Sequence, residues 1–369
     1  MASLLVTGGA GFIGANFVHY WLRSHPSERI VVLDSLTYAG NVSSLQSVTN
    51  WSDFRFAKGD IRNTELVEHL LRQENIDTIV HFAAESHVDR SILSPDTFIQ
   101  TNVLGTHSLL AAARKVWLKS NSVPHRFHHV STDEVYGSLG PDDPPFHEQT
   151  PYAPNSPYSA SKAASDHLVR AYHHTYGLQA TISNCSNNYG PHQFPEKLIP
   201  LVIVNILKGI PLPMYGDGKQ ARDWLHVYDH CRAIDLVLAA GAAGQTYNIG
   251  GGAELANIEL VSLLCSIGDR ILANCPHLDL RFPNSPASQG RPCASLISFV
   301  ADRSGHDRRY AMNYDKIAAS LGYRPSMALN DGLLHTFTWY LENEWWWRAV
   351  TDDTDQQWAH AQHGQTDTV

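Results

Sequence analysis

The feature that most constrains the fold is a set of regularly spaced glycines near the N-terminus. The segment Thr7–Gly14 reads TGGAGFIG, and Gly8, Gly11 and Gly14 give the spacing G-x-x-G-x-x-G. The segment follows an apolar run typical of a strand and opens a stretch with a helical pattern. Glycines at such a junction allow a tight turn in which the backbone approaches a pyrophosphate at a helix N-terminus. The pattern predicts a dinucleotide site, with a purely structural turn as the alternative.

Two acidic residues refine this prediction. Asp34 ends the second apolar run, 20 residues after Gly14. An acidic residue at this place accepts hydrogen bonds from the adenosine ribose hydroxyls and repels a 2′-phosphate, so NAD is predicted rather than NADP. Asp60, just past the third run, is placed to meet the adenine ring. For Asp60 the alternative is an ordinary exposed loop aspartate.

Alternation of strands and helices predicts the fold class. Strands are expected at Leu4–Thr7, Ile30–Leu33, Phe54–Ala57, Thr78–Phe82 and Phe127–Val130, and helices at Gly11–Arg23, Thr64–Arg72 and Pro95–Trp117. This order indicates an α/β fold, a Rossmann-type doubly wound parallel sheet whose ligand lies beyond the carboxyl ends of the strands. Dense Pro, Gly and Asn predict loops at 140–157, 187–195, 208–219 and 283–292.

At 369 residues the chain is long for one domain and suits two lobes that share a cleft. We expect residues 1–185 to form the dinucleotide-binding domain with the catalytic helix. Residues 186–349 are expected to form a smaller C-terminal α/β substrate-binding lobe, interleaved with the first domain. Residues 350–369 are polar and aperiodic, which predicts a flexible tail.

Composition excludes several classes of partner. The net charge is −9 and no basic stripe is present, so no nucleic-acid partner is expected. The N-terminus lacks the pattern of a signal peptide, and no apolar stretch approaches the ~20 residues of a membrane span. A cytoplasmic protein without a membrane partner is therefore expected. The five cysteines are odd in number and show no C-x-x-C spacing, so no metal site is predicted.

A tyrosine and a lysine supply the first candidate chemistry. Tyr158 and Lys162 are four residues apart in PYSASK, so on a helix both would share one face. An ammonium group and a positive nicotinamide ring would favour the phenolate and make Tyr158 a general base. The spacing also occurs by chance as a surface pair, but behind a dinucleotide motif it predicts alcohol oxidation.

Two adjacent acids extend the chemistry. Thr132, Asp133 and Glu134 follow the apolar run that ends at Val130, so they would lie at the carboxyl edge of the sheet. Thr132 can hydrogen-bond the hydroxyl group that Tyr158 deprotonates. Simple alcohol oxidation needs no further acids, whereas an elimination needs a carboxylate that removes a carbon-bound proton and an acid that protonates a leaving hydroxyl. The pair therefore favours a dehydratase, with helix-capping or solvated acids as the alternative.

These residues resemble a known family over nearly the whole chain, from residue 7 to about 340. The chain is similar to the dTDP-glucose 4,6-dehydratases, nucleotide-sugar enzymes of the extended short-chain dehydrogenase/reductase class. The motifs that carry the resemblance are TGGAGFIG at 7–14, LDSLTYAGN at 33–41, HFAAESHVDRSI at 81–92, STDEVYG at 131–137, PYSASKAASDHLVRA at 157–171, NCSNNYGPHQFPEKLIPL at 184–201, YGDGKQARDWLHVYDH at 215–230, YNIGG at 247–251 and ADRSGHDRRYA at 301–311.

The resemblance implies a redox-neutral reaction in three stages. Tyr158, helped by Lys162 and Thr132, would remove the proton of the sugar 4-hydroxyl while NAD takes hydride from C4. The 4-ketone would acidify the C5 hydrogen, so that Glu134 removes it while Asp133 protonates the C6 hydroxyl. Loss of water and return of hydride to C6 would give the 4-keto-6-deoxy sugar.

The resemblance also implies binding residues and a homodimer. The NAD site would comprise Gly8, Gly11, Phe12, Ile13, Gly14, Asp34, Ser35, Thr37, Asp60, Ile61, Ala83, Ala84, Ser86, Thr101, Tyr158, Lys162 and Asn188. The nucleotide sugar would contact Ser86, Thr132, Asn187, Glu196, Lys197, Leu198, Pro213, Tyr215, Arg222, Asn257 and the loop from Asp302 to His306. A surface ion pair with Asp223 is the alternative for Arg222, and loop capping is the alternative for the two asparagines 187 and 257.

Departures from the family pattern leave other functions open. His226 stands where members commonly carry Tyr, and the segment Arg281–Ser298 is longer than usual, which bears on base selectivity. A nucleotide-sugar 4-epimerase would share the glycines, Tyr158 and Lys162 but would not need both acids. A UDP-glucose 4,6-dehydratase and a non-catalytic NAD-binding protein are the further alternatives.

Overall fold

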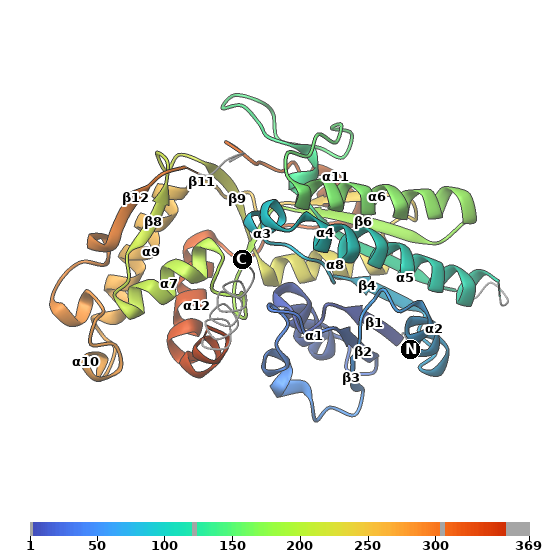
Figure 1. Ribbon diagram of the computed structural model, residues 1–369, viewed down its shortest axis with the longest axis horizontal. Coiled ribbons are helices and arrows are strands. Elements are labelled where there is room, and N and C mark those ends of the chain that lie inside the picture. The colour runs from blue at the N-terminus through green and yellow to red at the C-terminus, as the bar shows by residue number, and fades with distance from the viewer. Residues whose placement is uncertain (1–2, 120–123, 303–306, 352–369) are drawn as a thin grey trace, which may run out of the picture.

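In the computed structural model, which describes residues 3–119, 124–302 and 307–351, a sheet of seven parallel strands forms the centre of the first lobe (Figure 1). Its order is β10-β6-β5-β4-β1-β2-β3, so the chain winds outward in both directions from β1. The strands are β1 (Ser3–Thr7), β2 (Arg29–Asp34), β3 (Phe54–Lys58), β4 (Thr78–His81), β5 (Arg126–Thr132), β6 (Ala180–Cys185) and β10 (Thr246–Ile249). This confirms the Rossmann-type fold class.

Helices cover both faces of this sheet because successive strand side chains point to opposite faces. Leu4 and Val6 of β1 pack in one core with α1 (Phe12–Ser24), α8 (Val227–Ala240) and α11 (Asp315–Leu321). Leu5 packs in the other core with α2 (Thr64–Gln73), α5 (Thr106–Ala113) and α6 (Pro157–Tyr176). Strands buried on both faces explain the nearly continuous apolar runs of the sequence.

Short helical segments complete the first lobe. They are η1 (Val42–Val48), α3 (Val88–Leu93), α4 (Pro95–Phe98), the π-helical segments η2 (Ile99–Gly105) and η3 (Arg114–Leu118), and the 3-10 turn η4 (Asp133–Tyr136). The predicted single helix Pro95–Trp117 is therefore helical throughout, but two of its parts have π-helical hydrogen bonding.

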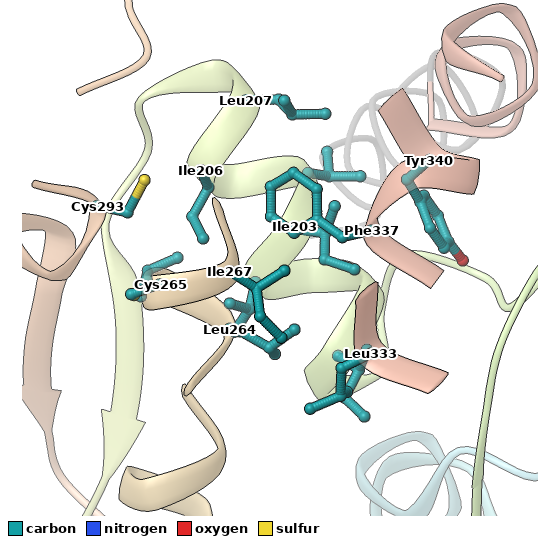
Figure 2. Close-up of a cluster of buried hydrophobic side chains, with 14 of the residues drawn as sticks. Ile203, Ile206, Leu207, Leu264, Cys265, Ile267, Cys293, Leu333, Phe337 and Tyr340 are labelled. Atoms are coloured by element: carbon teal, nitrogen blue, oxygen red, sulfur yellow. The ribbon is translucent and has the colours of Figure 1, made fainter. Parts of the chain in front are cut away.

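The second lobe has a core of its own, formed mainly by three helices. These are α7 (Leu198–Lys208), α9 (Asn257–Leu272) and α12 (Leu329–Glu342), and Figure 2 shows Ile203, Leu264 and Phe337 meeting between them. Two small sheets lie beside this core, in the orders β11-β9-β7 and β12-β8. The remaining elements are β7 (Asn187–Tyr189), β8 (Leu212–Tyr215), β9 (Ala221–His226), β11 (Glu254–Ala256), β12 (Ile297–Val300), α10 (Leu278–Arg281), η5 (Ala287–Gln289) and η6 (Cys293–Leu296).

The chain crosses between the lobes more than once. β10 pairs in parallel with β6, α8 packs on α1, and α11 packs on β10 and α8. Three elements from the C-terminal half therefore belong to the first lobe, and the first lobe is left and re-entered after β6. The division at residue 185 stays a prediction.

Several local predictions were wrong. The segments 187–195 and 208–219 were expected to be loops, but they contain β7 and β8, because short strands flanked by Pro and Gly give no periodic signal. The flexible tail was predicted to begin at residue 350, which is too early in the chain. Val350 is only 5% exposed in the core of the second lobe and Thr351 donates a hydrogen bond to the Trp347 carbonyl. The rest of the predicted tail lies outside the described residues. No helix in the described ranges is long and apolar enough to cross a membrane.

Candidate active site

One cavity of about 570 Å³ lies at the carboxyl ends of the central strands. Its lining includes residues that end or follow strands of this sheet, such as Gly8 after β1, Asp34 of β2, Thr132 of β5 and Cys185 of β6. This is the edge at which doubly wound sheets hold ligands. All the residues that the sequence assigned to the NAD site lie on this lining.

The glycine turn leaves no room for side chains beneath a ligand. Gly8 has a φ of +70°, and a Cβ there would lie 2.6 Å from the Ala83 backbone nitrogen. A Cβ on Gly14 would lie 2.2 Å from the Gly8 carbonyl oxygen. The turn therefore brings the backbone directly under the N-terminus of α1, which begins at Phe12. Such a cradle fits the pyrophosphate of a dinucleotide.

Asp34 is fixed beside this turn. Its Oδ2 accepts a hydrogen bond from the Ala10 backbone nitrogen at 2.9 Å, and its Oδ1 accepts one from the Leu36 nitrogen at 2.8 Å. Burial raises the pKa of the carboxyl group, and these two donors oppose the rise. Asp60 also lines the cavity, where Arg62 binds its carboxylate and lowers its pKa. The residues present fit the adenosine half of NAD.

The N-terminal end of α6 places Tyr158 and Lys162 in the cavity. Pro157 and a capping box between Ser156 and Ser159 fix the start of the helix, so the next turn has a defined orientation. Tyr158 is 8% exposed and Lys162 is 4% exposed. The Lys162 Nζ donates to the Val130 carbonyl oxygen at 2.8 Å. Burial lowers the pKa of Lys162 to about 8.

The electrostatics of the phenol differ from the simple expectation. Burial, followed by the charge of Glu134, raises the pKa of Tyr158 well above its ordinary value, and a hydrogen bond with Thr132 opposes the rise. The groups of the protein alone therefore favour the neutral phenol. A positive charge from a bound nicotinamide ring is needed to favour the phenolate.

The predicted elimination pair lies in the same cavity, where β5 ends and η4 begins. Thr132 accepts a hydrogen bond from the Glu134 nitrogen at 3.3 Å and donates one to Asp133 Oδ1 at 3.2 Å. Asp133 is only 2% exposed, and burial, then the charge of Glu134, raises its pKa well above its ordinary value. Thr132 is within hydrogen-bonding reach of Tyr158. The structure therefore brings the phenol and both acids to one place.

The predicted sugar-nucleotide residues fall into two groups. Ser86, Thr132, Asn187, Glu196 and Lys197 line the cavity. Leu198, Pro213, Tyr215, Arg222, Asn257 and Asp302 lie outside its lining, and His306 lies outside the described residues.

The second group gathers mainly around the turn between β8 and β9. Asp302 Oδ2 accepts a hydrogen bond from the Gln220 side chain at 3.1 Å. The Asn257 nitrogen donates to the Gln220 carbonyl oxygen at 2.9 Å. Asn257 Oδ1, like Asn187 Oδ1 in the cavity, is buried without a hydrogen-bond partner among the described residues. Such acceptors require a partner, so both asparagines have capacity for a ligand.

Arg222 lies between the two groups. Its guanidinium group donates to the carbonyl oxygens of Ala221 and Asp307 at 2.8 and 2.9 Å. It also lies over the ring of Tyr310, with 4.3 Å from Cζ to the ring centroid. Its charge lowers the pKa of Asp133, so it acts on the elimination pair across the lobes.

Sequence reasoning missed two buried residues that lie close to residues of this site without lining the cavity. Tyr310 is 6% exposed, and burial, then the charge of Glu134, raises its pKa. Tyr310 stands in the ADRSGHDRRYA motif, where it received no role. Asp166 is 2% exposed and lies one helical turn beyond Lys162. The repeat of Tyr158, Lys162 and Asp166 at intervals of four residues was the signal that could have revealed it.

Comparison with known proteins identifies what the chain is similar to. The sequence profile described as GDP-mannose 4,6 dehydratase matches residues 5–336. A dTDP-glucose 4,6-dehydratase of Xanthomonas campestris pv. campestris (strain B100) is 54% identical over 355 residues, which cover 95% of this chain and 97% of that protein.

Solved structures agree with the sequence comparison. DesIV, a dTDP-glucose 4,6-dehydratase from Streptomyces venezuelae crystallised with NAD, superposes with a TM-score of 0.83 and is 49% identical, covering 94% of this chain and 99% of that one. A UDP-glucose 4-epimerase from Thermotoga maritima gives a TM-score of 0.77 at 26% identity, covering 92% of this chain and 99% of that one.

Proposed function

The chain belongs to the GDP-mannose 4,6 dehydratase family, and on that basis we propose that it converts dTDP-glucose into dTDP-4-keto-6-deoxyglucose with NAD as its cofactor. The enzyme is a hydro-lyase whose overall reaction is redox-neutral, because the oxidation at C4 of the sugar is balanced by the reduction at C6. The similar dehydratases at about half sequence identity support the substrate, and the NAD in the DesIV crystal supports the cofactor.

One observation carries the proposal. Asp133, a buried carboxyl group with a raised pKa, shares a cavity with Glu134 and with Tyr158. A carboxyl group with a raised pKa keeps its proton to higher pH and can act as a general acid, while a neighbouring carboxylate acts as a base. Oxidation of an alcohol alone would need only Tyr158 and Lys162, so the additional pair supports an elimination.

The first stage oxidises C4. NAD, which the glycine turn and Asp34 would hold, would supply a hydride acceptor for C4 and a hydride donor for C6. Tyr158 takes the proton of the 4-hydroxyl, and the Thr132 hydroxyl, within hydrogen-bonding reach of the phenol, orients the reacting groups. Lys162, held at the Val130 carbonyl, supplies a buried positive charge near the phenol.

The second stage removes water across C5 and C6. The new ketone makes the C5 hydrogen acidic enough for a carboxylate, so Glu134 removes it as a proton. Asp133 donates its proton to the C6 hydroxyl, which leaves as water. In the last stage Glu134 returns a proton to C5 while hydride reaches C6, so the carbon skeleton ends with a ketone at C4 and a methyl group at C6.

The second lobe binds the nucleotide in this proposal. The buried Asn257 Oδ1 and the turn between β8 and β9 support a base and ribose site there. Arg222, between that turn and the acids, supports a diphosphate site, because guanidinium groups bind phosphate oxygens in bidentate fashion. The base remains to be tested, since a UDP-sugar would present the same diphosphate.

A homodimer and a cytoplasmic location belong to the same proposal. Ile92, Leu93, Ile99 and Leu104 are between 45 and 79% exposed on the segment from α3 to η2. An exposed apolar row of this kind supports a surface for a second copy. Sedimentation of the purified enzyme tests the dimer.

The decisive experiment separates oxidation from elimination. The purified enzyme with NAD is given dTDP-glucose or UDP-glucose, and formation of the keto sugar is followed by its absorbance in alkali. Asp133→Asn combined with Glu134→Gln keeps both shapes and removes both acids. We expect this variant to form NADH at C4 reversibly but to release no water.

Several outcomes contradict the proposal. Normal dehydration by the double variant would assign the elimination to other groups. An inverted 4-hydroxyl in place of a keto sugar would make the enzyme an epimerase, and zero turnover with intact NAD binding would make it a binding protein. Faster turnover of UDP-glucose than of dTDP-glucose would replace the proposed substrate but leave the proposed dehydration unchanged.

A further inference from the structure

Behind Lys162, away from the phenol, lies a second buried carboxyl group to which the reaction above gives no role. Asp166 follows Lys162 by four residues on α6, so both project from the same face of the helix. Its side chain is 2% exposed, and it packs beneath the end of β5 rather than on the surface. A carboxyl group is costly to bury unless it is hydrogen-bonded and paired.

His129 of β5 lies beside both charged groups. Its Nε2 lies 3.2 Å from Asp166 Oδ1 and 3.5 Å from the Lys162 Nζ. The His129 side chain is fully buried, and burial, then the charge of Lys162, lowers its pKa well below the ordinary value, so the ring is neutral. Both contacts are made by the same ring nitrogen, which cannot accept from Lys162 and also donate to Asp166, and Asp166 Oδ1 has no hydrogen-bond partner among the described residues. Asp166 therefore acts on Lys162 by its charge, across the edge of a neutral ring.

The other carboxyl oxygen is fixed by neutral groups. Asp166 Oδ2 accepts hydrogen bonds from Ser131 at 3.0 Å, from Tyr152 at 2.9 Å and from Asn184 at 3.4 Å. Donors from three different elements favour the ionised carboxylate over the neutral acid. Burial still raises the pKa of Asp166 to about 6, and Lys162 is the strongest opposing influence.

Lys162 depends on this arrangement for its charge. Burial lowers the pKa of Lys162 to about 8 even though the charge of Asp166 opposes the lowering more than any other group does. The titratable groups that face the pair from the neighbouring elements are His81 of β4, His129 and Asp133 at β5, Cys185 of β6, Tyr136 of η4, Tyr152 of the loop before α6, and Tyr158.

We propose that Asp166 is a positioning residue, whose negative charge, one helical turn from Lys162 on the same face of α6, keeps the Lys162 ammonium group charged beside Tyr158. Asp166 touches neither sugar nor cofactor. It acts on the first oxidation only through Lys162, because a neutral lysine amine would leave the phenol without a neighbouring cation. The inference rests on the proposed function, since it concerns the base that begins that reaction.

The test is the pH profile of turnover by Asp166→Asn. Removing the negative charge lowers the pKa of Lys162, so the ammonium group is lost at lower pH than in the wild type. We expect the alkaline limb of kcat to move to lower pH by roughly one unit or more, the effect of one opposite charge a few ångströms away. KM for the nucleotide sugar should stay within about twofold, because no binding group changes.

Matched variants separate this role from a structural one. Asp166→Glu restores the charge and should return the limb toward its wild-type position. Ser165→Ala removes the neighbouring buried side chain, which donates to the Asn102 and Ser161 carbonyl oxygens, without changing any charge. It should lower the melting temperature while leaving the limb in place. An unmoved limb in Asp166→Asn, or an equal shift in Ser165→Ala, overturns the inference.

A second variant covers the case in which Asp166→Asn does not fold. Asp166→Ser also removes the charge, and its hydroxyl group is smaller than the carboxylate and can still meet donors such as Ser131 and Tyr152. The alkaline limb of kcat should again move to lower pH by roughly one unit or more. An unmoved limb in a folded Asp166→Ser enzyme overturns the inference. A wild-type enzyme that forms no keto sugar would instead overturn the proposed function, whatever the variants do.

Discussion

Replacement of Gly14 by alanine tests the dinucleotide cradle most directly. A Cβ at this position would lie 2.2 Å from the Gly8 carbonyl oxygen and 2.8 Å from the Gly9 Cα. To reach the shortest contact that real Cβ atoms show, 3.0 Å, the turn and the start of α1 must separate by roughly 0.8 Å. Both neighbours are backbone atoms, so no side-chain rotation relieves the contact.

The magnitude follows from the packing. Forcing one methyl group into a close-packed site costs about 1–3 kcal/mol. The displaced atoms are those that would face the pyrophosphate, so part of this cost appears in binding. We expect the Kd of NAD to rise roughly 10- to 100-fold, which corresponds to about 1.4–2.8 kcal/mol. Titration calorimetry with NAD measures the part of the cost that appears in binding, and thermal unfolding measures the part that appears in the stability of the protein.

Two other glycines provide matched controls. A Cβ on Gly11 would be 3.3 Å from the Gly8 oxygen, and its φ of −81° suits any residue, so Gly11→Ala should weaken NAD by only a few-fold. Gly177 has a φ of +76° with nothing within 4 Å, so Gly177→Ala should lower stability without changing NAD affinity. The proposed pyrophosphate cradle would be refuted if Gly14→Ala bound NAD with wild-type affinity, or if Gly11→Ala lost as much NAD affinity as Gly14→Ala.

Two further predictions concern the catalytic phenol and acid stability. Tyr158→Phe should reduce NADH formation at C4 by roughly 10²- to 10⁴-fold with little change in melting temperature, and stopped-flow absorbance would contradict this if NADH still formed at the wild-type rate. His230 is fully buried and its pKa is lowered to about 3, so the unfolded state binds the proton first as the pH falls below 6.5. Its contribution to stability is complete above pH 6.5 and falls by about 2 kcal/mol on going to pH 5. Urea unfolding above pH 6.5 and at pH 5 measures how much stability each protein loses between the two conditions. His230→Gln should lose less than the wild type by this amount. Equal losses in the two proteins would show that His230 is not the group responsible.

The sequence by itself determined the class of fold and predicted where the dinucleotide would bind. Strands buried on both faces appear in the sequence as continuous apolar runs. A positive φ or a blocked Cβ favours glycine, so the spacing of Gly8, Gly11 and Gly14 between a strand and a helix indicated the turn. The sequence also predicted that Tyr158 and Lys162 lie together, because residues four apart on a helix share one face.

Only the tertiary structure decided how far Asp133 is buried. Asp133 and Glu134 are chemically similar neighbours in sequence, and burial, then the charge of Glu134, raises the pKa of Asp133, which supports its proposed role as the acid. Short strands such as β8, and the burial of Val350, also depend on contacts with distant segments and leave no local pattern. His129 and Asp166 are 37 residues apart in sequence, so their contact behind Lys162 exists only because β5 and α6 pack together. The periodicity of apolar residues predicts the structure of a single helix or strand. The charge of a buried group depends instead on all the residues packed around it, which only the tertiary structure shows.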